Sequence, residues 1–200
     1  FLFKDKIKSM VENTINKNIN ATVTFQEMDL SLLKSFPLAN LTLEETTVIN
    51  AAPFLGDTLF YGKEVNLRMS VMEFFKSGNE PMNLQSFSVN EGNINIIVNK
   101  DGLGNYDIVK ETSGSPDAKQ ENTLSLNIEE YEIDDLDFSY FDEESNMKVS
   151  VDSIIHSGKG NFAKDILDLD TKSTAKLSVD MDGTNYMNNV AISLDAIIGI

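Results

Sequence analysis

The sequence predicts a mainly β protein of the α+β class, with an N-terminal amphipathic helix before a long, strongly twisted, antiparallel meandering sheet. Apolar residues recur at spacings of three and four only near the N-terminus. From residue 21 onward the apolar period is two, which is typical of half-buried strands. Turn residues such as Asp182-Gly183 separate these segments without intervening helices, which favours antiparallel pairing.

The helix is predicted over residues 4–19, with lysine and glutamate on its polar side. Its apolar positions are Ile7, Met10, Val11, Ile15 and Ile19. Such a helix either packs on a sheet or lies along a membrane surface.

The first series of strands is expected between residues 21 and 110. Phe36-Pro37 interrupts it because proline cannot donate a ladder hydrogen bond, and VMEFF (71–75) predicts one or two helical turns. Residues 90–109 predict a strand, a turn at Asp101-Gly102 and a second strand. The residues expected on the apolar face of this series include Val23, Phe25, Leu67, Met69, Phe87, Val89, Ile94, Ile96 and Val98.

A second series is expected over residues 124–200, after a Ser-, Gly- and Pro-containing loop or linker at 111–123. Its apolar face includes Phe138, Tyr140, Leu177 and Val179. The chain begins without a methionine and ends inside a predicted strand, so we expect it to be part of a longer protein.

Composition excludes several functions. The formal net charge is -16 and Arg68 is the single arginine, so a nucleic-acid partner is not expected. The absence of cysteine removes disulfides, thiolate metal sites and cysteine nucleophiles. No apolar run reaches the roughly 20 residues of a membrane-spanning helix.

Catalytic chemistry has little support in the sequence. The single histidine, His156, stands between an apolar pair and a Ser-Gly turn, and we expect it to be structural or exposed rather than part of a triad. The aspartates at 134–137 and 165–170 lack a calcium-binding loop pattern. We therefore expect no enzyme activity, no metal and no cofactor.

A sheet that is apolar on one face must cover that face. One helix of about 24 Å, at roughly 1.5 Å per residue, can cover only part of it. The sheet therefore either closes as a β-sandwich or curls into an open groove with a hydrophobic occupant, for which lipid is the natural choice. The pattern alone favours the sandwich.

An ordered set of motifs resembles the N-terminal region of AsmA-like proteins. After the helix come NATVTFQEMDLSLLKSFPLANLTLEETTV (20–48) and PFLGDTLFYGKEVNLRMSVMEFFKSG (53–78), followed by EGNINIIVNKDGLGNYDI (91–108). The later DFSYFDEESNMKVSVDSI (137–154) and YMNNVAISLDA (186–196) are similar to the next β-units of that family.

The resemblance implies a non-enzymatic lipid-handling module in phospholipid transport and outer-membrane biogenesis in the bacterial envelope. It implies a periplasmic chain held at the inner membrane by an anchor preceding this sequence. Residues 1–20 would be the membrane-proximal helix, 21–110 and 124–200 two β-groove units, and the second unit truncated. The apolar-face residues named above would then contact acyl chains. The alternative is a structural or scaffold envelope protein with a closed sandwich and a protein partner at its sheet edges.

Overall fold

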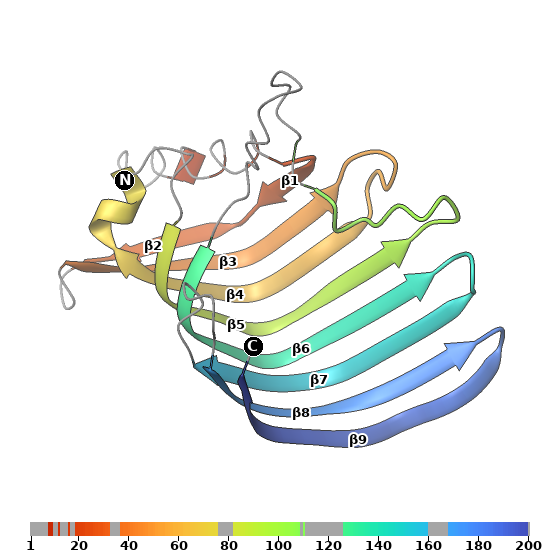
Figure 1. Cartoon of the computed structure of the whole chain (residues 1–200). Coiled ribbons are helices and arrows are strands. Elements are labelled where there is room, and N and C mark those ends of the chain that lie inside the picture. The colour runs from red at the N-terminus through yellow and green to blue at the C-terminus, as the bar shows by residue number, and fades with distance from the viewer. Residues whose placement is uncertain are drawn as a thin grey trace, which may run out of the picture.

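The computed structural model describes residues 8–9, 12, 16, 19–32, 37–75, 82–108, 110, 126–159 and 168–199. Within them, nine strands form a single open sheet in the order β1-β3-β4-β5-β6-β7-β8-β9, with β2 also paired to β3 (Figure 1). The elements are β1 (Ala21–Thr24), β2 (Glu27–Ser31), β3 (Leu38–Asn50), β4 (Thr58–Ser70), the 3-10 helix η1 (Val71–Phe75), β5 (Met82–Val98), β6 (Leu126–Asp142), β7 (Met147–Lys159), β8 (Asp168–Met181) and β9 (Thr184–Gly199).

The mainly β class and the open sheet are confirmed, and the closed sandwich is wrong for the described strands. The helical turn predicted at 71–75 is present as η1. The helix predicted over 4–19 lies mostly outside the described residues. Lys8, Ser9, Glu12 and Asn16 have helical backbone, and Ile19 forms a β-bridge. The described part of the chain is mainly β.

The expected uninterrupted antiparallel meander is wrong at one position, because β5 and β6 run parallel, with Met82 opposite Leu126 and Val98 opposite Asp142. Parallel neighbours need a crossover connection, and residues 99–125 provide it. The predicted linker at 111–123 lies inside this connection and outside the described residues. The strands on either side of it belong to the same sheet.

The second strand predicted within 90–109 is also absent. After β5, the side chain of Asn99 accepts hydrogen bonds from the backbone N–H groups of Asp101 and Leu103, both at 3.0 Å, which closes a turn. The chain then returns through a single bridge between Val98 and Gly104. The buried side chain of Asn105 makes the hydrogen bonds that a second strand would make. It accepts a hydrogen bond from Ile97 N at 2.9 Å and donates one to Asn95 O at 2.8 Å.

One face of the sheet carries the apolar core. Its buried members come from β2 to β6 and from the residue that follows β1. They are Phe25, Met28, Leu41, Leu43, Val65, Val89 and Leu136. The partly buried side chains packed against them are Leu30, Phe60, Leu67, Phe87, Ile94, Ile133 and Ile154.

Within most of the long strands, the apolar residues switch between odd and even sequence positions. In β5, Phe87 and Val89 lie on the core face, and so do Ile94 and Ile96, although regular alternation would put the two pairs on opposite faces. The extra residue is Glu91, whose φ of 53° is left-handed. β3 and β6 change parity at Glu45 and Asp135, with φ values of 52° and 56°.

These irregularities line up across the sheet as a crease. Lys63 of β4 lies between Glu45 and Glu91, and Asp135 of β6 lies opposite Glu91. The crease continues into β7 at Ser153, with a φ of 52°. The bulge of β9 at Asn189, with a φ of 55°, is separate from it and lies at the level of Ser178, beyond the Leu177–Val190 pair. Bulged residues of this kind bend a strand and increase its twist, and the long strands of the sheet are bent in Figure 1.

Side chains satisfy the backbone groups that the crease and the separate bulge of β9 remove from the ladder. In β7, Ser153 N donates to Asp137 Oδ1 at 2.9 Å, and in β9, Asn189 N donates to Ser178 Oγ at 3.0 Å. An unpaired N–H at such a position would cost free energy wherever water is excluded. The crease is therefore supported by specific polar residues on the neighbouring strands.

We predict that Asp135→Gly stabilises the protein and that Asp134→Gly destabilises it. Asp135 is exposed and has positive φ, which glycine adopts without strain, whereas Asp134 is a regular strand residue. The free energy of unfolding should change by about 0.5–1 kcal/mol in each variant, with opposite signs. Urea midpoints measure both; destabilisation by Asp135→Gly equal to that of its neighbour would contradict the bulge.

A second prediction concerns two threonines of β3. Thr46 Oγ1 is buried without a hydrogen-bond partner, whereas Thr42 Oγ1 donates to Asn66 Oδ1 at 2.7 Å. Thr46→Val should raise the free energy of unfolding by up to about 1 kcal/mol, and Thr42→Val should lower it by about 1 kcal/mol. Thermal or urea unfolding tests the pair; a loss in Thr46→Val as large as in Thr42→Val would show that the Thr46 hydroxyl is satisfied.

Candidate functional site: the apolar concave face

An uninterrupted apolar row crosses the sheet from edge to edge on the core face. The strand registers place one apolar residue of each strand from β1 to β9, apart from β2, opposite the next. These residues are Val23, Val48, Phe60, Ile94, Phe138, Val151, Leu177 and Val190. With strands about 4.8 Å apart, the row is roughly 34 Å long.

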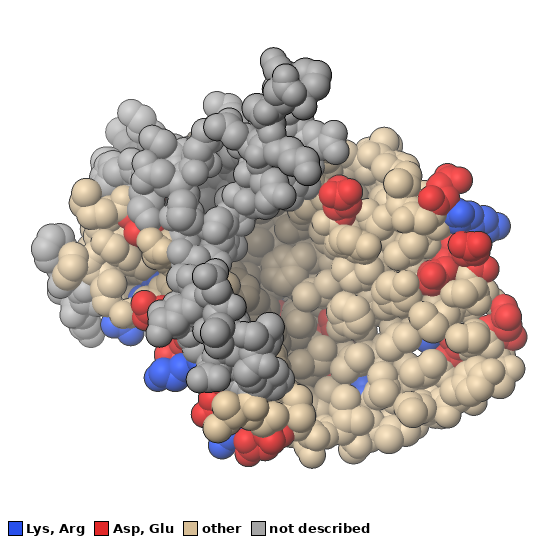
Figure 2. Space-filling view, in the orientation of Figure 1, with Lys and Arg blue, Asp and Glu red and all other residues tan. Residues whose placement is uncertain are grey.

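The face that carries this row is concave. The sheet curves along its length in Figure 1, and the space-filling view shows a hollow lined largely by uncharged residues, with aspartate and glutamate around its edge (Figure 2). Along the strands the opposite face alternates with it and is polar, for example Asn66 and Arg68 in β4 or Lys172 and Lys176 in β8. Along the described strands, charged side chains therefore lie mainly on the face opposite the hollow or at its edge.

Side chains on the concave face are deeply buried on β3 to β5 and largely exposed on β9. Leu43, Val65 and Val89 have exposed fractions of 6%, 5% and 3%. In β9, which pairs with β8 alone among the described strands, Val190 is 45% and Leu194 is 49% exposed. The face is thus a packed core at one side and an accessible apolar surface at the other.

The structure brings together all the lipid-contact residues predicted from the sequence. Phe25 and Val89 belong to the buried core, and Met69 is 2% exposed. The others are buried or partly buried strand residues of the same face: Val23, Leu67, Phe87, Ile94, Ile96, Val98, Phe138, Tyr140, Leu177 and Val179. Their shared face is a structural fact; their contact with lipid stays a prediction.

The prediction missed residues on strands whose parity changes or whose pattern is weak. Val48, Phe60 and Val151 complete the cross-sheet row, and Val190 forms its exposed end, with Ile192 beside it on the same face of β9. A sequence signal for these residues does exist, because the apolar residues switch from odd to even positions around Glu91-Gly92. Such a switch indicates a bulge when both halves of the strand must face the same core.

Four polar side chains interrupt the apolar rows on β6, β7 and β8. The hydroxyl of Tyr131 lies 2.6 Å from Nε2 of His156, and Ser173 Oγ lies 2.6 Å from Nδ1 of the same ring. Thr171 Oγ1 donates to Ser157 O at 3.0 Å and lies 3.4 Å from Nδ1. His156 was expected to be structural or exposed; it is half-buried and holds this polar group together.

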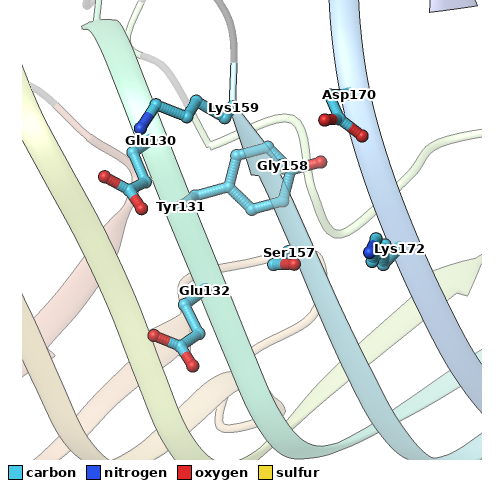
Figure 3. A pocket seen from close by; sticks show the side chains of 8 residues that line it. All are labelled: Glu130, Tyr131, Glu132, Ser157, Gly158, Lys159, Asp170 and Lys172. Atoms are coloured by element: carbon cyan, nitrogen blue, oxygen red, sulfur yellow. The ribbon is translucent and has the colours of Figure 1, made fainter. Parts of the chain in front are cut away.

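Behind this group, the polar face has a depression of about 280 Å³. Figure 3 shows Tyr131 extending from β6 past Gly158 of β7, with charged side chains around it. The charged residues are Glu130, Glu132, Lys159, Asp170 and Lys172. They alternate with Tyr131, Gly158 and Thr171 along their strands, so they point to the opposite side of the sheet.

Tyr140 and Asp142 lie where β6 ends, at the rim of the hollow. Burial raises the pKa of Tyr140, and the negative charge of Asp142 and the nearby Tyr106 add to this rise. The pKa of Asp142 is lowered, chiefly because its carboxylate accepts the backbone N–H of Ser145 at 3.0 Å. A charged Asp142 therefore fixes the turn between β6 and β7.

Comparison with known proteins leaves the family open: no family model matches the chain, and no curated protein matches its sequence significantly. Within the described part of the chain, no helix is long and apolar enough to cross a bilayer. The concave face and its polar group are thus the features from which a function can be argued.

We predict that acid weakens the wild-type fold more than it weakens Asp142→Asn. Because the folded pKa of Asp142 is depressed, its stabilisation is present above the unfolded value near 3.8 and is lost as pH falls through the folded value. Urea midpoints at pH 7 and pH 3 measure the effect. An identical pH dependence in both proteins would exclude this contribution.

Proposed function

We propose that this chain is a non-enzymatic lipid-handling module whose concave face holds acyl chains. The observation that carries the proposal is the unbroken apolar row from Val23 to Val190, which lies on an open sheet and becomes accessible toward β9. An exposed apolar face of this kind marks a ligand or partner surface in a soluble protein. The resemblance to AsmA-like proteins supports phospholipid as the ligand class, and a periplasmic, inner-membrane-anchored setting.

The dimensions of the row fit this ligand. It is roughly 34 Å long, whereas the acyl chains of one leaflet occupy roughly 15 Å, half of a bilayer core. One or two chains can therefore lie across the strands. Each methylene removed from water contributes about 0.8 kcal/mol, so covering roughly six contributes about 5 kcal/mol before the cost of association.

A second function, pairing with an envelope protein, is favoured by the exposed edge of β9. Within the described sheet β9 has one neighbour, and its side chains include exposed apolar residues, among them Ile192 and Ile197. An edge of this length can accept another strand through backbone hydrogen bonds. This function does not require lipid on the concave face, which separates the two by experiment.

We predict that protein purified without detergent carries lipid, and that Val190→Glu loses it while Ala191→Glu keeps it. The two residues are adjacent and exposed in β9, but Val190 lies in the apolar row and Ala191 on the polar face. A charge at Val190 places an ionised group beside the acyl chain, which is costly without a partner. Mass spectrometry of extracted lipid measures the outcome.

Both variants should unfold at similar urea concentrations, because both sites are accessible to water. Equal lipid content in Val190→Glu and Ala191→Glu would remove the concave face from lipid binding. Lipid-free wild-type protein that takes up no added phospholipid would favour the partner-binding function.

A further inference from the structure

We infer that Tyr131, His156 and Ser173 form a subsite for the oxygen atoms at the head of an acyl chain, those of a carboxyl or ester group. This inference rests on the proposed function and adds to it the place and polarity of the ligand's head. It predicts a defined orientation, in which the polar end lies at β6–β8 and the hydrocarbon extends along the apolar rows.

The position of the group is the first argument. The row Leu43–Val65–Val89–Ile133 continues directly to His156 and Ser173 in the strand registers. The neighbouring row continues from Phe87 to Tyr131. Ligand sites are mostly apolar and contain a few convergent polar groups that fix orientation, and these rows end in such a set.

The geometry of the group is the second argument. Both ring nitrogens of His156 lie 2.6 Å from a hydroxyl oxygen, which fixes the orientation of the imidazole. The Tyr131 and His156 rings are 5.0 Å apart, and a Cβ at Gly158 would come within 2.4 Å of the Tyr131 ring. The absence of a side chain at Gly158 leaves room for the tyrosine, so the hydroxyls are held in place before any ligand arrives.

The charge of the group selects the ligand. Serine and tyrosine hydroxyls can each donate and accept hydrogen bonds, and a histidine can do either according to its protonation. The nearest lysines in sequence, Lys159 and Lys172, alternate with Gly158 and Thr171 and point to the polar face. Among the described residues, the subsite therefore has no fork of cationic donors of the kind that clamps a phosphate, and it fits a carboxyl or ester oxygen better.

The backbone around Ser173 favours ligand binding over ester hydrolysis. A serine beside a histidine resembles the start of a catalytic triad, but acyl transfer also needs N–H donors aimed at the developing oxyanion. Ser173 lies inside β8, which pairs with β7 at His156 and with β9 at Leu194. The backbone donors around it belong to these ladders and are not directed at a ligand.

The test uses the full chain and displacement of a fluorescent fatty acid by oleic acid, methyl oleate, dioleoyl phosphatidylglycerol and 1-octadecene. Ser173→Ala and Tyr131→Phe each remove one hydroxyl, and Thr174→Ala is the control on the exposed opposite face of β8. We expect Ser173→Ala and Tyr131→Phe to weaken binding of oleic acid and methyl oleate about three- to tenfold, the value of one hydrogen bond. Octadecene binding and the control should be unchanged.

The competitors identify the source of the oxygen. If the two variants lose affinity for oleic acid alone, the subsite binds a free carboxyl group. If they also lose affinity for methyl oleate and the phospholipid, the subsite binds an ester. Unchanged affinity for all three, or equal weakening for octadecene, would overturn the subsite and leave the lipid-handling function standing. Failure of the wild type to bind any of the four would overturn both. Release of oleic acid from methyl oleate would replace binding by hydrolysis.

Discussion

The crease is the constraint on which the rest of this structure depends. A strand has a strict side-chain period of two, so a long amphipathic strand that bends must gain or lose one residue if both arms are to keep their apolar side chains on one face. Glu45, Glu91 and Asp135 supply that residue at matching positions of three strands. The bend and the continuity of the apolar face therefore have one cause. Because the bulged residues are charged and partly exposed, as in the Lys63–Glu91 ion pair at 2.7 Å, the crease faces water on its other side.

The burial gradient distinguishes the β3–β5 region of the sheet from its β9 edge. Around β3 to β5 the side chains are buried to a few per cent exposure, which is the packing that stabilises a domain. Around β9 the same alternation leaves Met187, Ile192 and Leu194 more than two-fifths exposed. The buried core and the accessible apolar surface thus lie on different strands of one face. An evenly buried sandwich would not separate them in this way.

The sequence allows the fold class and the apolar face to be predicted, because alternation over 13 to 17 residues is a strong local signal. The parallel pairing of β5 with β6 could not be predicted in the same way, since it depends on a crossover with no periodicity of its own. The second strand after Val98 was a wrong prediction because Asn99 and Asn105 hold the chain by side-chain hydrogen bonds that mimic a turn and a ladder. The polar group around His156 could not be predicted from the sequence for a third reason. Its members stand on three strands, and only the registers bring them together.

The same registers explain why polar residues at these positions are tolerated. A lone histidine among apolar rows would cost free energy, because its ring nitrogens would lose water without gaining partners. Tyr131 and Ser173 provide those partners, and Thr171 is satisfied by the backbone of Ser157. A serine hydroxyl can both donate and accept, so Ser173 Oγ can bond a ligand oxygen while it is bonded to the ring. If these positions only had to fill the sheet, aliphatic residues would do so at a lower free-energy cost, as in the row from Val23 to Val190, which lies four or five residues away along the strands. A hydrogen-bonded polar group of this size on a largely apolar concave face is what the proposed ligand with one polar end would explain.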